Sequence, residues 1–231
     1  MVSEEKRVEK GQYTWSYSSL DLYKQCPHKY YRIKVKKDVV DPPTPHIRYG
    51  LDFHKAAEEF VRDRKPMPER FDFAKGVVEK LDSIQGEKLC EKKLGLRRDL
   101  SPCDFFAKDV WWRGIADLII LQPEKERAFV VDYKTGKSAK YASVDQLEIL
   151  SLAVFKHFPQ VKSVKGGLAF VVANDFVNAA FDAGTADIKW SKWLEGTSQL
   201  EQSIELGVWN PRQNFTCRKW CPVKDCPHNG V

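Results

Sequence analysis

The sequence has no long apolar run. None approaches the roughly 20 residues that a membrane-spanning helix needs, and the charged start, MVSEEKRVEKGQ, lacks the apolar core of a secretory signal. No internal repeat, low-complexity tract or linker-like stretch divides the 231 residues. We therefore expect a soluble, cytoplasmic protein with no membrane partner, in the host cytoplasm if its source is viral, and a single domain over residues 1–231.

A strong charge bias is also absent. Lys and Arg number 38 against 32 Asp and Glu, a net charge of +6 that is compatible with a polyanionic partner but too small to identify one. Cysteine is sparse, with six residues. Because an intracellular compartment does not sustain disulfides, we expect these thiols to bind metal or to be buried.

Hydrophobic periodicity divides the chain into helices and strands. A Ser18–Asp21 capping-box spacing predicts a first helix from about Leu20. Helical spacing predicts further helices over 51–63, 71–84, 144–158 and 187–207, and continuous or alternating apolar residues predict strands over 88–96, 111–121, 128–134, 166–173 and 177–183. This order predicts an α/β fold with a mixed central sheet flanked by helices, a core at about 18–185, and a C-terminal helix and Cys-rich tail at about 187–228.

Each of two predicted strands carries a polar residue that is costly to bury. Side chains alternate along a strand, so Asp132 and Lys134 share one face and Tyr133 takes the other. Asp117 lies within an apolar run, where a carboxylate costs several kcal/mol unless a cation or hydrogen bonds compensate it.

Two explanations fit these acids. One is a buried ion pair between Lys134 and either Asp132 or Asp117. The other is a magnesium or manganese site, since carboxylates are the ligands that these ions prefer and a neighbouring lysine can orient water or neutralise phosphate. The second explanation is the chemistry of phosphodiester hydrolysis.

The motif VVDYKTGK, preceded by Asp117, resembles the PD-(D/E)XK nuclease superfamily and its RecB-like branch. Other segments extend the resemblance in the same order along the chain: YGLDFHKAAEEF with His54, CEKKL with Glu91, and DQLEIL with Gln146. The resemblance implies a metal site of His54, Asp117, Asp132 and the Tyr133 carbonyl, and a catalytic set of Lys134, Asp132, Asp117, Glu91 and Gln146. Glu87 is a rival for the role of Glu91, and position 150 is Leu where the family commonly carries Tyr.

The tail contains a second constellation. Cys217, Cys221 and Cys226 follow one another closely in a segment without periodicity, a pattern typical of a metal–thiolate site. Together with Cys26 they resemble the one-early, three-late cysteines of iron–sulfur nucleases of the RecB-like branch, of the CRISPR-adaptation and phage recombination type. That resemblance implies a 4Fe-4S cluster. Zinc, with His228 as a substitute ligand, and packed thiols without metal remain alternatives.

The resemblance also has implications for activity and partners. The resemblance implies a magnesium- or manganese-dependent DNA nuclease, most similar to exonucleases acting on DNA ends or single strands in replication, recombination or repair. DNA is the expected partner, with recombination or replication proteins and a homo-oligomer as further candidates. The alternatives are a non-catalytic nucleic-acid-binding module with a structural iron–sulfur or zinc site, and a structural zinc-tail protein whose Asp–Lys pair is a core ion pair.

No DNA-contacting residue follows from the pattern alone. Four aromatic residues, Trp111, Trp112, Tyr133 and Tyr141, could stack on bases, but aromatic residues beside apolar strands are usually core. Cys90 and Cys103 lie outside both constellations, and we expect them to be buried or incidental thiols.

Overall fold

The structure, a computed structural model, describes residues 13–140 and 142–231. The described chain forms two compact units: one holds the residues up to Pro42 together with Ser191–Val231, and the other is Pro43–Trp190. Whether the two act as the single domain expected for residues 1–231 stays a prediction. None of the described helices combines the length and the apolar composition needed to cross a bilayer.

The Pro43–Trp190 unit is built on one six-stranded sheet in the order β2-β1-β3-β4-β5-β6. Its strands are β1 (Glu87–Leu96), β2 (Pro102–Cys103), β3 (Trp112–Gln122), β4 (Arg127–Lys134), β5 (Ser163–Phe170) and β6 (Asp175–Asp182). All neighbours pair antiparallel except β4 and β5, which are parallel and are connected through helix α5 (Asp145–His157). The predicted α/β fold with a mixed sheet is confirmed.

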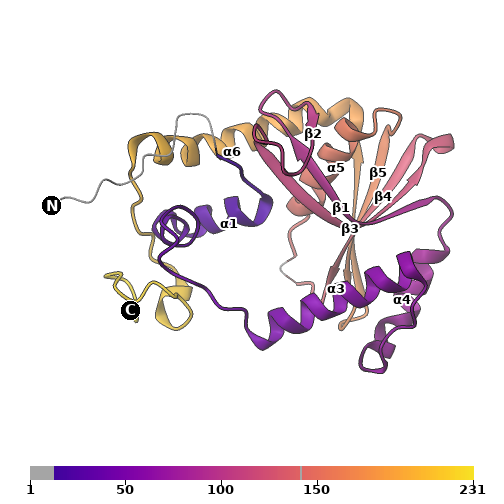
Figure 1. The fold of residues 1–231 in the computed structure, drawn as a ribbon, viewed down its shortest axis with the longest axis horizontal. Coiled ribbons are helices and arrows are strands. Elements are labelled where there is room, and N and C mark those ends of the chain that lie inside the picture. Colours follow the sequence, from indigo (N-terminus) through magenta and orange to yellow (C-terminus); the bar gives the residue numbers. More distant parts are fainter. Residues whose placement is uncertain (1–12, 141) are drawn as a thin grey trace. The chain divides into compact units, whose positions relative to one another are not determined.

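Helices cover both faces of this sheet (Figure 1). On one face, α3 (Pro45–Asp63) and α4 (Asp72–Ser83) bury an apolar stripe, including Phe53 and Val78, against Leu118 and Val131 of the strands. On the other face lies α5, which is buried along most of its length. Its Leu147 sits so close to Gly166 of β5 that an added Cβ there would lie 3.2 Å from it. Single turns complete the unit: η2 (Glu69–Phe71), η3 (Pro123–Lys125) and η4 (Ala183–Thr185).

The other unit joins the two ends of the described chain. It contains α1 (Tyr17–Gln25), α2 (Pro27–Tyr30), the π-helix η1 (Tyr31–Val35), α6 (Ala186–Leu206) from Ser191 onward, and η5 (Phe215–Arg218). Trp15 is buried and stacks on Trp193, with ring centroids 6.2 Å apart. The Tyr23 hydroxyl donates a hydrogen bond to the Gln199 carbonyl at 2.8 Å. Aromatic packing and these cross-links hold segments that are far apart in sequence.

The predicted elements are present, with ends that differ by a few residues, but two details of the prediction are wrong. The capping box of α1 is formed by Ser16 and Ser19 rather than Ser18 and Asp21, so the helix begins at Tyr17. A serine hydroxyl here replaces the carboxylate that usually accepts from the N-cap N–H. Strand β2 was not predicted, because two residues are too few to show a period.

The central core residue of α3 gives a test of this packing. Phe53 is 0% exposed, whereas Phe73 on α4 is 52% exposed. Phe53→Ala should lower the free energy of unfolding by about 3–5 kcal/mol because it leaves a cavity between α3 and the sheet. Phe73→Ala, the matched control, should change it by no more than about 0.5 kcal/mol. Urea unfolding monitored by circular dichroism measures both, and equal effects would contradict the described core.

Candidate active site

The ladder between β1 and β3 is interrupted at one pair of residues. Cys90 pairs with Leu118 and Lys92 with Ala116, but no pair joins the intervening Glu91 and Asp117. Glu91 has a left-handed backbone, with φ 47°, which is uncommon for a residue with a side chain. Such local strain is typical of functional sites, where surrounding structure holds it in place.

The interruption changes which side chains face which helix. Gly114 faces Leu150 of α5, while Leu118, four residues later on β3, packs with the α3–α4 core. Strict alternation would keep both residues on one face. The alternation therefore changes phase near Asp117, and the two acidic residues occupy the point of change.

Asp117 also lies where β3 and β4 stop pairing. The last pair of that ladder on this side is Leu118 with Val131. Beyond it, the Tyr133 backbone N–H donates a hydrogen bond to Asp117 Oδ2 at 2.7 Å. The Asp117 carboxylate thus replaces a backbone carbonyl as the acceptor for the Tyr133 N–H. This hydrogen bond holds the carboxylate where β3 and β4 stop pairing.

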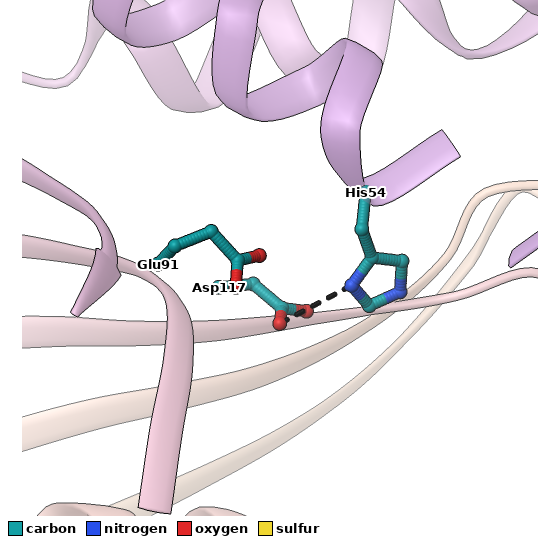
Figure 2. Close-up of side chains that lie close together, drawn as sticks. All are labelled: His54, Glu91 and Asp117. Carbon is teal, nitrogen blue, oxygen red and sulfur yellow. Dashed lines mark ion pairs between the residues drawn. The ribbon is translucent and has the colours of Figure 1, made fainter. Parts of the chain in front are cut away.

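Three side chains meet at this point (Figure 2). His54 on α3 places Nδ1 3.2 Å from Asp117 Oδ1. His54, Glu91 and Asp117 each offer one ligand atom, and these atoms lie within 4.8 Å of one another; the described part of the chain has no other such set of three. The side chains are partly enclosed, with His54 28% and Asp117 11% exposed. An imidazole and two carboxylates at this spacing fit a divalent ion such as magnesium or manganese.

Asp132 stands beside this trio in a network of its own. Its Oδ2 pairs with the Lys134 ammonium at 2.6 Å, and its Oδ1 accepts a hydrogen bond from Gln146 Nε2 at 2.5 Å. Lys134 Nζ donates to Gln146 Oε1 at 2.9 Å, which closes the network. Tyr133 points the other way, into the α3–α4 core, with its ring 5.7 Å from that of Phe53.

The acids of the site repel one another. Burial, and then the charge of Asp117, raise the pKa of Glu91 to about 7. Burial and Asp117 likewise raise the pKa of Asp132 to about 6, against the opposing effect of Lys134. Burial lowers the pKa of His54, but the hydrogen bond to Asp117 and the nearby acids outweigh it and the net shift is upward. The negative charge that raises these pKa values would also stabilise a bound cation.

The structure brings together all six predicted side chains of the site. These are His54, Glu91, Asp117, Asp132, Lys134 and Gln146. The tightest set contains Glu91 where the sequence favoured Asp132 as the third side-chain ligand, because Lys134 and Gln146 hold Asp132. The Tyr133 carbonyl as a ligand stays a prediction; the contact that Tyr133 makes here is through its N–H.

The predicted cysteine set also comes together. Cys26, Cys217, Cys221 and Cys226 line one pocket in the unit that joins the two ends of the described chain. Backbone N–H groups of Lys29 and Arg212 each lie 3.4 Å from Cys26 Sγ. The Asn214 N–H lies 3.4 Å from Cys217 Sγ. Donors aimed at sulfur suit thiolates that bind metal.

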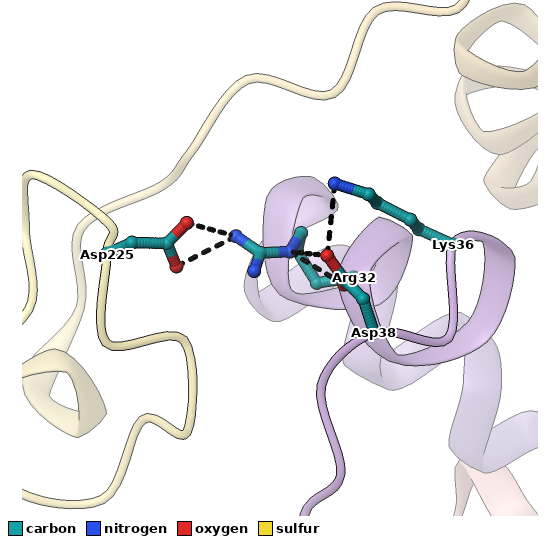
Figure 3. A network of polar contacts seen from close by, with 4 residues as sticks. All are labelled: Arg32, Lys36, Asp38 and Asp225. Carbon is teal, nitrogen blue, oxygen red and sulfur yellow. Dashed lines mark hydrogen bonds and ion pairs between the residues drawn. The ribbon is translucent and has the colours of Figure 1, made fainter. Parts of the chain in front are cut away.

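An arginine that the sequence did not point to fixes the tail beside these thiols (Figure 3). Arg32 Nη1 donates to both carboxylate oxygens of Asp225 at 2.8 Å, and Arg32 Nε donates to Asp38. Asp225 immediately precedes Cys226, so the contact ties the last thiol to the first helices. No local pattern could reveal it, because 193 positions separate the two residues.

The aromatic residues considered for stacking are core residues. Trp111, Trp112 and Tyr133 are each at most 4% exposed, and Tyr141 lies outside the described residues. Cys90 and Cys103 are partly buried thiols, and Cys90 packs against the α3–α4 core.

Comparison with known proteins places these observations in a family. A family model described as the PD-(D/E)XK nuclease superfamily matches residues 14–226. A candidate exonuclease from Eubacterium rectale shares the fold, with 12% identity, a TM-score of 0.51 and coverage of 100% of this chain and 94% of that one. The structure of SSO0001 is 14% identical with a TM-score of 0.41, covering 97% and 90%. No curated protein matches.

The raised pKa of Glu91 gives a prediction with a defined sign. Its folded-state value, about 7, exceeds the ordinary 4.5, so the metal-free folded protein binds more protons and loses stability as pH rises between these values. Glu91→Gln should remove this loss and stabilise the metal-free protein at pH 8 by roughly 1–2 kcal/mol, since partial exposure screens the charge. It should also abolish stabilisation by manganese.

Thermal melts at pH 5 and pH 8, with EDTA or manganese, measure both effects. Glu87→Gln, an exposed acid on the same strand, is the matched control. If Glu91→Gln instead destabilised the metal-free protein at pH 8, the acids would be structural and not a cation site.

Proposed function

Because this chain belongs to the PD-(D/E)XK nuclease superfamily, we propose that it is a magnesium- or manganese-dependent DNA nuclease. Its activity is that of an exonuclease on DNA ends or single strands, in replication, recombination or repair, as the RecB-like motifs imply. One observation carries the proposal: His54, Glu91 and Asp117 converge within 4.8 Å, next to the Asp132–Lys134 pair. A binding module gains nothing from clustered acids that repel phosphate, unless a metal offsets them.

The residues divide into a metal-holding set and a set that faces the substrate. His54, Glu91 and Asp117 supply the ligand atoms, and Asp132 adds a further carboxylate beside them. A divalent ion bound there supplies Lewis acidity, which polarises the scissile phosphate and lowers the pKa of bound water. The Tyr133 N–H fixes the Asp117 carboxylate in advance, and a bound ion would take the place of the proton between His54 Nδ1 and Asp117 Oδ1.

Lys134 is placed to act on water and phosphate. Its side chain is 35% exposed while that of Asp132 is 4% exposed, so the ammonium extends from the buried acid toward solvent. There it can orient the attacking water and stabilise charge that develops on the phosphate. Gln146 holds both residues through its amide, and this fixes the ammonium relative to the acids.

Replacing Lys134 tests the catalytic part of the proposal. Lys134→Ala should reduce metal-dependent cleavage by 100-fold or more, an estimate of order 10²–10³ for loss of one electrostatic group, while manganese still stabilises the fold. DNA labelled separately at its 5′ and 3′ ends, single- or double-stranded, measures cleavage and its polarity. Lys165→Ala, an exposed lysine of β5, should cleave like wild type.

The outcomes separate the candidate functions. Release of short end-labelled products in manganese but not in EDTA supports the exonuclease. Folded wild-type protein that binds DNA and never cleaves it would contradict the nuclease and favour the non-catalytic binding module.

We propose further that Cys26, Cys217, Cys221 and Cys226 hold an iron–sulfur cluster of the 4Fe-4S type. The four thiols line one pocket, and backbone N–H groups lie 3.4 Å from the sulfurs of Cys26 and Cys217, surroundings that suit a metal–thiolate site. The resemblance to iron–sulfur nucleases of the RecB-like branch favours the multi-iron cluster over zinc. The cluster acts structurally, by fixing the tail to the junction of α1 and α2, where Cys26 lies.

Cysteine substitution tests the cluster. Cys226→Ser should reduce bound iron and sulfide to a small fraction of wild type and lower thermal stability, because the tail loses its anchor. Cys103→Ser, at a thiol outside the pocket, should keep wild-type iron. Metal and sulfide analysis of protein purified without oxygen gives the readout. Zinc in place of iron in wild type would identify the alternative site, and wild type without either metal would mean that the thiols are simply packed.

A further inference from the structure

An aromatic and basic cluster takes its cations from β1 and β3, the strands that carry Glu91 and Asp117 of the metal site. Phe105 and Phe106 follow β2, and their ring centroids are 5.0 Å apart. Lys93 of β1 lies over both rings, with Nζ 5.8 Å and 5.3 Å from the centroids, and Arg113 of β3 lies 5.3 Å over Phe105. We call these four residues the Phe105–Phe106 cluster.

The cluster is open to solvent within its unit. Phe106 is 70% exposed. Ile115, which pairs with Lys93, is 39% exposed, whereas residues 118–121 at the other end of β3 are buried. Exposure of Ile115 indicates that α3 and α4 do not extend over this part of the sheet. Aromatic faces beside cations are the elements with which proteins bind single-stranded nucleic acid.

The charges of the cluster are not neutralised. Among the described residues, neither Lys93 nor Arg113 has an ion-pair partner, although Arg97 on the same strand pairs with Asp109. The two cations contact aromatic rings and leave their remaining donors for solvent or for an anion. Phosphate groups are anions that such a pair can hold.

The position of the cluster relates it to the metal site. Lys93 is two residues from Glu91 and Arg113 is four from Asp117, distances of about 7 and 13 Å along the strands. Arg113, Ile115 and Lys93 lie on the face opposite to Gly114 and Leu94, the face away from α5. A strand of nucleic acid bound over the cluster would reach the metal site within roughly two to four nucleotides, since stacked nucleotides rise about 3.4 Å each.

From this arrangement we propose that the Phe105–Phe106 cluster binds an unpaired strand of the nucleic-acid substrate and leads it to the metal site. Lys93 and Arg113 hold phosphates, and Phe106 stacks on a base. A base is free to stack on a side chain only when it has left its neighbours in the duplex, so the cluster selects single-stranded substrate or frayed ends. The proposal rests on the proposed nuclease function and specifies its substrate.

Binding of labelled oligo-dT to the full chain in EDTA, where no cleavage occurs, tests the cluster directly by fluorescence anisotropy. Phe106→Ala should weaken binding about tenfold, from the loss of one stacked base. Lys93→Gln with Arg113→Gln should lower the slope of log affinity against log salt by about 1.4, close to 0.7 for each lost phosphate contact to a single strand. Thermal melts in manganese should show unchanged metal binding in these variants.

Controls come from the opposite edge of the same sheet. Phe176→Ala on β6 and Lys165→Gln on β5 remove an exposed aromatic residue and an exposed cation there, and both should bind oligo-dT like wild type. Unchanged affinity in the cluster variants, or tighter binding of a blunt duplex than of oligo-dT, would overturn the proposal. Cleavage by wild type is measured in parallel. If wild type cleaves DNA but the cluster substitutions leave oligo-dT affinity unchanged, only the role of the cluster is rejected. If the substitutions weaken binding but wild type does not cleave, the nuclease function is rejected.

Discussion

Everything at the proposed active site depends on how Asp117 is held. A carboxylate in the interior of a sheet is stable only where donors or cations face it. Asp117 receives the Tyr133 N–H on one oxygen and the His54 imidazole on the other. These contacts are possible because β3 leaves its partners on both sides at this residue: the pair with Glu91 is missing from the β1 ladder, and the β4 ladder ends one residue away. The break in the sheet and the site are one feature.

The same feature explains the protonation of the site. Glu91 and Asp132 are close enough to Asp117 for its charge to raise the pKa of both. Lys134 offsets part of this repulsion at Asp132, and His54 offsets part of it at Glu91, where burial and Asp117 still raise the pKa to about 7. The acids are therefore only partly compensated within the protein, and this residual repulsion is what a divalent cation would relieve. In a purely structural ion pair, a cation would compensate every carboxylate.

Much of this could be predicted from sequence, and the remainder has identifiable causes. The periods of α3, β3 and β4 predicted those elements. The cost of burying Asp117 and Asp132 left an ion pair and a metal site as alternatives, and the resemblance to the nuclease superfamily favoured the metal site. The left-handed backbone of Glu91 was not predictable, because glutamate has no intrinsic preference for that conformation and the surrounding sheet imposes it. The Arg32–Asp225 contact and the Phe105–Phe106 cluster likewise depend on distant segments that only the folded chain brings together.

The most direct test of the central claim is anomalous diffraction from crystals of this chain grown with manganese. The account predicts a manganese peak bonded to His54 and to carboxylate oxygens of Glu91 and Asp117, with metal–oxygen distances of about 2.0–2.2 Å. The Tyr133 N–H should still donate to Asp117. A map in which manganese is absent from these residues, with Asp117 still bound only by His54 and Tyr133, would contradict it and leave the cluster of acids as part of the core.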